Sequence, residues 1–260
     1  MSWARPTTPK RADQHDDLIS NHLAVLAGQL PGTPAWWFVR YRSPHDADHI
    51  RMRIQVAGPA QRGAYTAAVG AWGTVLRQAG LISDLSLNTY SPEIGRYGSG
   101  PALSGAEAVF VADSYFAAAA LTGSGLTGVN GQALVATGLV DIARNLLGPD
   151  NGLRWLAERT VQAPAAARTV TDQAVALVRA ETPAARGWQT ALTTAWHHRA
   201  GALAMYRERY GAMDMNAVLE SLLHMHHNRL RGVNRDDEKA CRRIARQAAL
   251  SCLAWTGTDS

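Results

Sequence analysis

Residues 49–56, HIRMRIQV, alternate strictly between polar and apolar side chains. Every second residue from His49 to Gln55 is polar, and this period of two predicts a half-buried β-strand. The aromatic and β-branched run AWWFVRYR, residues 35–42, predicts an antiparallel neighbour, because only a short turn at residues 43–46 and a few polar residues separate the two.

The regions around this hairpin extend the prediction to a fold class. A helical pattern over residues 62–79 is followed by a third predicted strand over residues 81–90. Ser104 and Glu107 have capping-box spacing before an apolar-rich helix, and the chain beyond Gly131 is helical in pattern. The sequence therefore predicts an α+β fold, in which a small antiparallel or mixed sheet in the N-terminal half packs against a largely helical C-terminal half.

The composition is that of a chain able to fold as one large domain without crosslinks. It has 260 residues, 47% of them hydrophobic, and no uncharged apolar run long enough to cross a bilayer. The N-terminus lacks the apolar segment of an export signal, so we expect a cytoplasmic protein. Cys241 and Cys252 are too far apart along a predicted helix to form a disulfide with each other.

The positive charge is almost entirely arginine. Lysine and arginine total 26 against 21 acidic residues, and only Lys10 and Lys239 are lysines, which leaves 24 arginines. Compositional bias explains most of them, but some are candidates for binding carboxylate or phosphate, which a guanidinium group grips with two hydrogen bonds. The charge permits nucleic-acid binding, yet the chain has no basic run with interleaved aromatic residues.

Two arginines of the strand HIRMRIQV form the first candidate site. Arg51 and Arg53 leave the same face of the strand about 7 Å apart, where an anion would relieve their mutual repulsion. Arg40 and Arg42 on the preceding strand are placed to extend this surface. A solvated sheet face explains the pattern equally well.

A second candidate lies in SPEIGRYGSG, residues 91–100, which the proline and glycine content predicts to be a loop. Glu93 and Arg96 are of interest because loops on a rigid scaffold often hold binding residues. Taken alone, the pair is better explained as a local ion pair that closes the turn.

The third candidate is the predicted helix containing ESLLHMHHNRLRG. At about 100° per residue, one face carries Glu220, His224, His227, Asn228 and Arg231, and His226 points away. A histidine beside Asn and Arg suits general acid–base chemistry, although taken alone it is better explained by packing in a helix seam. We expect no metal, because the histidines have no cysteine or nearby aspartate to complete a set and HExxH is absent.

The three motifs occur in an order that resembles a known family. WWFVRYRSPHDADHIRMRI, then YSPEIGRYG followed by AEAVFVADS, then LLHMHHNRLRGVNRDDE resemble the elimination domain at the C-terminal end of class I lanthipeptide dehydratases. The same domain occurs as a separate protein in thiopeptide and related pathways. The resemblance runs from about Trp36 to Ala249 and indicates a single elimination-type domain over residues 15–255, after a flexible tail over residues 1–14.

The resemblance implies a lyase. It would eliminate glutamate from glutamylated Ser and Thr residues of a ribosomally made precursor peptide, leaving dehydroalanine or dehydrobutyrine, and would use no cofactor. By motif match, the catalytic residues are His224, Arg96, Arg53 and Arg51. The same match gives the substrate-binding residues as Arg51, Arg53, Glu93, Arg96, Asn228 and Arg229. His224 would move a proton, either from Cα or toward the leaving group.

Two other functions stay open. Enzymes that form the central pyridine of thiopeptides by a formal [4+2] cycloaddition share this fold, but they release no glutamate, so the arginine and histidine motifs favour elimination. The other is a non-catalytic scaffold that binds the precursor peptide along an exposed sheet edge.

As partners we expect the precursor peptide with its leader and a separate glutamylating protein that uses glutamyl-tRNA. We expect no directly bound nucleic acid and no membrane, and a homodimer is compatible with the sequence.

Overall fold

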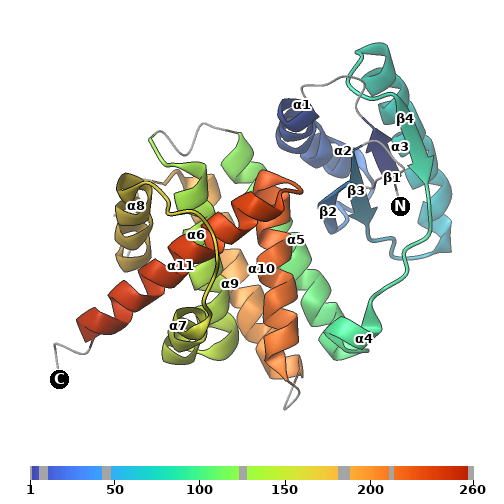
Figure 1. The fold of residues 1–260 in the computed structure, drawn as a ribbon. Coiled ribbons are helices and arrows are strands. Elements are labelled where there is room, and N and C mark those ends of the chain that lie inside the picture. Colours follow the sequence, from blue (N-terminus) through green and yellow to red (C-terminus); the bar gives the residue numbers. More distant parts are fainter. Residues whose placement is uncertain are drawn as a thin grey trace.

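The fold is α+β, with a sheet at one side of the molecule and a group of packed helices at the other (Figure 1). The computed structural model describes residues 2–5, 11–42, 48–122, 128–180, 188–210 and 214–256. The turn predicted at residues 43–46 lies outside the described residues.

The sheet has four antiparallel strands in the order β2–β3–β1–β4. They are β1 (Ser2–Arg5), β2 (Trp36–Tyr41), β3 (His49–Ile54) and β4 (Asp84–Leu87). Strands β2 and β3 form the hairpin that the alternation predicts, with Trp37 opposite Arg53 and Val39 opposite Arg51. The third predicted strand is present as β4, although it is shorter than residues 81–90.

Strand β1 is the element that the sequence pattern does not predict. From the resemblance we expect a flexible tail over residues 1–14, but Ser2–Arg5 pair with both β3 and β4, and a helix begins at Arg11. A strand of four residues is too short for its alternation to stand out. Its place is set by two neighbouring strands rather than by its own composition.

Helices flank the sheet within the N-terminal part. They are α1 (Arg11–Asp17), the π-helical stretch η1 (Leu18–Leu23), α2 (Ala24–Gln29) and α3 (Pro59–Gln78). Helix α3 approaches β4 closely at Gly73, where a Cβ would lie 2.2 Å from Leu85 Cδ2. The missing side chain thus allows this helix to contact the sheet.

The helical part begins after the sheet. Its elements are α4 (Ile94–Tyr97), α5 (Pro101–Leu121), α6 (Gly131–Leu147), α7 (Pro149–Glu158), α8 (Arg168–Arg179), α9 (Thr190–Tyr210), α10 (Met215–Arg231) and α11 (Arg235–Thr256). Helix α5 begins at Pro101, so the capping box predicted at Ser104 is wrong. Proline suits the first turn because it has no N–H to leave unbonded, and the Ser104 hydroxyl instead donates to the Gly100 carbonyl.

Side chains from two helices cover the free edge of β2 and join the two parts. The Phe38 N–H donates to Ser114 Oγ at 3.1 Å, and the Phe38 carbonyl accepts from Arg229 Nε at 3.1 Å. The amide of Asn228 bonds both the N–H and the carbonyl of Arg40, each at 2.8 Å. An edge strand needs partners for these groups, and here they fix α5 and α10 against the sheet.

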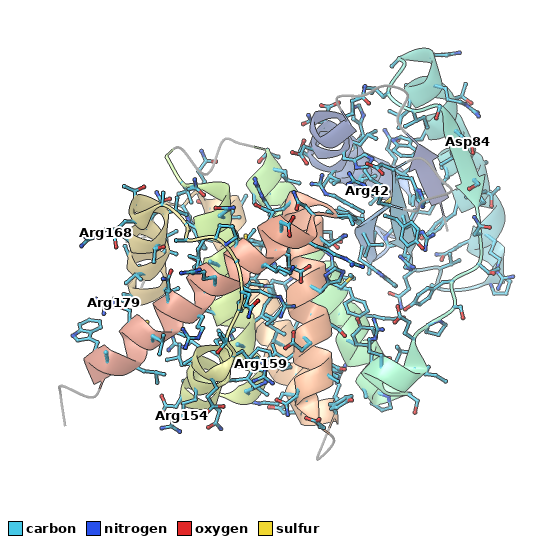
Figure 2. The ribbon with its side chains drawn as sticks, viewed as in Figure 1. Arg42, Asp84, Arg154, Arg159, Arg168 and Arg179 are labelled. Atoms are coloured by element: carbon cyan, nitrogen blue, oxygen red, sulfur yellow. The ribbon has the colours of Figure 1, made fainter. Side chains whose placement is uncertain are left out.

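Much of the arginine excess lies on the outside of the helical part. Figure 2 shows Arg154, Arg168 and Arg179 projecting from its surface, and all three are exposed. Among the described residues, no helix is both long and apolar enough to cross a membrane. The arginines that concern the site are the few that lie where the sheet meets α10.

Candidate functional site

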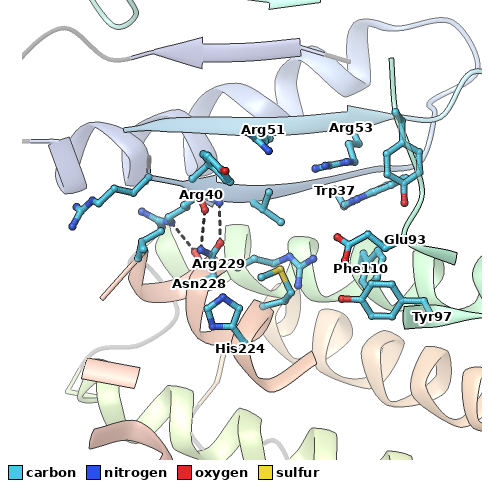
Figure 3. A pocket seen from close by; sticks show the side chains of 16 residues that line it. Trp37, Arg40, Arg51, Arg53, Glu93, Tyr97, Phe110, His224, Asn228 and Arg229 are labelled. Atoms are coloured by element: carbon cyan, nitrogen blue, oxygen red, sulfur yellow. Dashed lines mark hydrogen bonds between the residues drawn. The ribbon is translucent and has the colours of Figure 1, made fainter. Parts of the chain in front are cut away.

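A pocket of about 290 Å³ lies where β2 and β3 face α10 and the chain around α4 (Figure 3). Its walls include the aromatic residues Trp37, Tyr41, Tyr90, Tyr97 and Phe110. The proposed catalytic and substrate-binding residues that line it are Arg51, Arg53, Glu93, His224, Asn228 and Arg229, and the sequence candidates Arg40 and Arg42 line it as well. Three motifs that lie far apart in the chain therefore meet at one cavity, and of the proposed catalytic and substrate-binding residues only Arg96 is not part of its lining.

Arg51 lies on the pocket face of β3 and is held by aromatic groups. Its guanidinium carbon lies 3.4 Å from the centre of the Tyr41 ring, and its Nε donates to His49 Nε2 at 3.2 Å. A ring nitrogen that accepts this bond is unprotonated, so His49 is neutral in this arrangement. These contacts keep the guanidinium group at the pocket wall.

Arg53 is the less satisfied of the two β3 arginines. Its Nε is buried and has no hydrogen-bond partner, and its guanidinium carbon lies 5.2 Å from the centre of the Tyr90 ring. Burial, together with the positive charges of Arg51 and Arg229, lowers the pKa of Arg53 from its ordinary value, and Tyr90 and Glu93 oppose this. An anion in the pocket would supply the missing partner.

Arg40 and Arg42 do not extend this cationic surface. Arg40 Nη2 lies 2.6 Å from Asp16 Oδ1, and Arg40 Nε donates to the Arg229 carbonyl at 3.0 Å. Arg42 makes two hydrogen bonds to Asp48, at 2.9 and 3.0 Å. Both arginines line the pocket, but their charges are already paired with carboxylates of this chain.

Glu93 and Arg96 form the local ion pair that their spacing favours. Arg96 Nη1 lies 3.0 Å from Glu93 Oε2, and both side chains are more than half exposed. The segment predicted to be a loop contains one helical turn, α4, which directly follows Glu93. Only Glu93 lines the pocket, and it holds Arg96 just outside.

His224 reaches the pocket from α10 with its orientation set by α11. Its Nδ1 lies 2.9 Å from Glu238 Oε2, and Glu238 also accepts from Arg242 Nε at 3.2 Å. Burial opposes ionisation of Glu238, but the hydrogen bond to His224 and the charges of His224 and Arg242 lower its pKa. Because an ionised carboxylate only accepts, Nδ1 carries the proton of this contact, and in a neutral ring Nε2 would be the nitrogen without a proton.

The helix face predicted to be shared by several α10 residues is the contact seam with α11. The pairs along this seam are Glu220 with Arg242, His224 with Glu238, and both His227 and Arg231 with Asp237. Asn228 is the exception, because its amide is used on the β2 edge. The 3.6-residue period is therefore right for the seam, and only His224 on it also reaches the pocket.

A buried ionic cluster supports the pocket from the helical side, and the sequence motifs do not reveal it. Asp113 of α5 lies 2.7 Å from His226 Nδ1, 2.8 Å from Arg229 Nη1 and 3.0 Å from Arg199 Nη1. Burial opposes its ionisation, but these three groups hold the pKa of Asp113 well below its usual range. The available signal was an acid in an otherwise apolar helical run, because such a residue needs a buried partner.

Room for this cluster comes from a glycine on α6. A Cβ at Gly138 would lie 2.1 Å from His226 Nε2, so any larger residue would displace the ring. Arg199 also pairs with Asp141 at 3.0 Å, which gives the cluster a second carboxylate. Arg229 therefore enters the pocket with a guanidinium group already fixed by Asp113 on one side.

The expectation of no metal rests partly on a premise that the structure overturns. Helix α11 brings Asp237 and Cys241 to His227, and their ligand atoms all lie within 4.8 Å of one another. However, Asp237 already accepts from Arg231 Nε at 3.1 Å and from Gln132 Nε2 at 2.8 Å. Burial raises the pKa of Cys241 to about 12, so the thiolate that a metal would need is disfavoured.

Comparison with known proteins gives a family and a fold. The family model described as the lantibiotic biosynthesis dehydratase C-terminal region matches residues 9–249. The crystal structure of the tRNA-dependent lantibiotic dehydratase MibB from Microbispora sp. 107891 superposes with a TM-score of 0.78 at 22% identity, over 98% of this chain and 28% of MibB. The chain thus spans little more than a quarter of the length of that relative. No curated protein sequence matches it.

Proposed function

The chain belongs to the family of C-terminal domains of lantibiotic biosynthesis dehydratases, and we propose that it eliminates glutamate from glutamylated Ser and Thr residues of a precursor peptide. The observation that carries this proposal is the pairing, in one pocket, of an arginine without a partner for its Nε and a histidine oriented by a carboxylate. The first suits a carboxylate leaving group, and the second suits a proton transfer.

The charge of the pocket fits the substrate. A serine esterified through the α-carboxyl of glutamate has a free side-chain carboxylate, and its leaving group becomes a second carboxylate. Arg51, Arg53 and Arg229 face the cavity, and Glu93 is the only acid among the described lining residues. Guanidinium groups placed where negative charge develops stabilise the transition state.

The orientation of His224 favours the role of general base. Nε2 accepts the proton from Cα of the esterified residue, the Cα–Cβ double bond forms, and the Cβ–O bond breaks to release glutamate as its carboxylate. Arg53 stabilises the charge on the departing oxygen atoms. Glu238 does not touch the substrate; it is a positioning residue that holds the proton on Nδ1 and stabilises the ring once Nε2 is protonated.

Arg96 takes part only after its ion pair is exchanged. Its 3.0 Å contact with Glu93 keeps it outside the lining, so a substrate carboxylate must replace Glu93 as its partner. Because both side chains are more than half exposed, this exchange costs little, since exposed ion pairs contribute about 0–1 kcal/mol. Arg96 would then hold the free side-chain carboxylate of the glutamyl group.

The wider setting follows from the same chemistry. A glutamylating partner that uses glutamyl-tRNA attaches the glutamate, and the domain described here, over residues 15–255, acts on the glutamylated peptide in the cytoplasm. Neither tRNA nor a membrane is a ligand of this chain in the proposal. The support is the family match and the likeness to one part of MibB.

The decisive experiment uses a glutamylated precursor peptide and the purified protein. We expect free glutamate to appear and the peptide to lose one glutamic acid in mass for each site, with loss of both signals in His224→Ala. A peptide that is cyclised with expulsion of its leader, without glutamate release, would support the cycloaddition alternative instead. If His224→Ala and Arg53→Met leave pathway output intact, the scaffold alternative replaces the lyase.

A further inference from the structure

A groove adjoins the pocket on the far side of Arg53 and Tyr90. It has a volume of about 670 Å³ and runs between α3 and the chain that follows β3 and β4. Trp37, Arg53 and Tyr90 line both the groove and the pocket, so the two cavities share a wall. A ligand that reaches across Arg53 would occupy both.

The groove differs from the pocket in its chemistry. Its apolar lining consists of Ile54, Val56, Tyr65, Val69 and Leu87, together with the shared aromatic residues. Arg62 and Glu107 are its other charged lining residues, and they are of opposite sign. The pocket therefore attracts anions, whereas the groove fits side chains that are uncharged.

Two of the groove residues are large apolar side chains left exposed to solvent. Val56 is 39% exposed and Leu87 is 48% exposed; Val56 follows β3, and Leu87 is the last residue of β4. Single exposed apolar residues need no explanation, but a pair that lines one groove beside a candidate active site marks a contact surface. Covering both would remove this apolar area from water.

We propose that this groove binds the residues of the substrate peptide that flank the glutamylated Ser or Thr. The inference rests on the proposed function, because a peptide substrate must leave the pocket on at least one side of the reacting residue. Arg53 and Tyr90 separate the glutamyl end from the flanking residues. Cavities of about 300–1,000 Å³ accommodate a drug-sized ligand, which corresponds to roughly three or four residues of extended peptide.

The proposal predicts a preference for apolar residues next to the reacting site. A short fluorescein-labelled peptide with one serine flanked by apolar residues should bind in an anisotropy titration, and Leu87→Lys and Val56→Lys should each weaken binding about tenfold. The matched control is Val75→Lys, because Val75 is 61% exposed on α3 but does not line the groove. Val75→Lys should bind the peptide as the unaltered protein does.

Steady-state kinetics distinguish an effect on peptide binding in the groove from an effect on the elimination step. For the glutamylated form of the same peptide, we expect the two groove variants to raise KM about tenfold with little change in kcat. With capped O-glutamyl-serine, which has no flanking residues, they should match the unaltered protein. Neither Leu87 nor Val56 belongs to the catalytic pocket, so this substrate also reports whether each variant is correctly folded.

The outcomes keep the groove and the proposed function apart. One outcome is that glutamate is never released, although the labelled peptide binds and both groove variants weaken its binding. That result supports the proposal of a peptide-binding groove and contradicts the proposed lyase activity. If elimination proceeds and neither variant changes peptide binding or KM, the groove proposal is overturned. It is also overturned if the variants alter only the sedimentation of the protein, because the occupant is then a second copy of the chain.

Discussion

Two groups of arginines meet at the pocket, and they differ in what they contact. Arg199 and Arg229 lie on the helical side and are buried with Asp113, which pairs with both. Arg51 and Arg53 lie on β3, where they contact the rings of Tyr41 and Tyr90. Both Arg199 and Arg53 have a buried Nε with no hydrogen-bond partner, but among the described residues Arg199 pairs with a carboxylate through its other nitrogens and Arg53 does not.

This difference separates arginines that stabilise the fold from Arg53, whose charge a bound anion would pair. Removing either partner of a buried ion pair destabilises the protein, because the remaining charge is left without compensation. A half-buried cation without a partner destabilises the unliganded protein, and it is retained where a ligand supplies the missing charge. Arg229 joins the two groups, since it is fixed by Asp113 and also lines the pocket.

The largest effect should come from removing the carboxylate that the buried cluster shares. We expect Asp113→Asn to lower the free energy of unfolding by about 3–5 kcal/mol, because Arg199 and Arg229 would then be buried with much less compensation. Urea denaturation at neutral pH measures this. Asp172→Asn is the control: its pair with Arg168 is largely exposed, so a change within about 0.5 kcal/mol is expected. If Asp113→Asn and Asp172→Asn lowered the free energy of unfolding equally, the buried cluster would not have the stabilising role assigned to it.

Arg53→Met should show the opposite pattern. We expect glutamate elimination to fall about a hundredfold or more, because a group that stabilises developing charge is lost. The free energy of unfolding should be unchanged or higher, because an incompletely paired buried cation is removed. Arg53→Lys keeps the charge but loses the planar guanidinium group, so its elimination rate should lie between those of the unaltered protein and Arg53→Met. An Arg53→Met variant that unfolds readily yet still eliminates glutamate would reverse the assignment of the two groups.

The sequence predicts the sheet and helices well where a long periodic pattern exists. The alternation of HIRMRIQV fixes which face Arg51 and Arg53 occupy, and the structure places both at the pocket. Strand β1 is not predicted, because its four residues show no clear pattern and their position is set by pairing with β3 and β4. The start of α5 is missed because a glycine–proline junction, rather than Ser104, begins the helix.

The candidate site is predicted in part for a physical reason. Motifs indicate residue types, but they do not show which partners have already been taken by neighbours distant in the chain. Asn228 is used by the backbone of Arg40, and Arg40 itself is used by Asp16. The Asp113 cluster could not be found from spacing, because its members come from four helices, α5, α6, α9 and α10, that only tertiary packing brings together.

The seam between α10 and α11 is an intermediate case, with pairs that are partly exposed. Burial opposes ionisation of Asp237, but hydrogen bonds from Arg231, Gln132 and His227 lower its pKa to about 2. A depressed pKa means that the stabilisation is fully present above about pH 4 and is lost as the pH falls toward 2. We therefore expect Asp237→Asn to cost about 2 kcal/mol of unfolding free energy at pH 7.

The pH dependence of that cost is the test of its origin. Urea denaturation of the unaltered protein and of Asp237→Asn should give a constant difference between pH 5 and 7 and a shrinking one below about pH 4. A difference that persists unchanged to pH 3 would mean that packing, and not ionisation, accounts for the loss. Asp236→Asn serves as the control, because Asp236 is exposed and its 3.9 Å pair with Lys239 is worth little.

The smallest effect should come from Glu238, which connects the seam to the pocket without facing the cavity. Replacing it by Gln keeps the shape but removes the charge that stabilises the protonated His224 ring, so we expect kcat for elimination to fall about tenfold with KM unchanged. Glu238→Asp should restore part of the rate, because it restores the carboxylate. A merely structural role predicts a different result, in which Gln and Asp lower the unfolding free energy and raise KM together. Arg242→Gln helps to separate the two, since it removes a seam partner of Glu238 but leaves the contact between Glu238 and His224 in place.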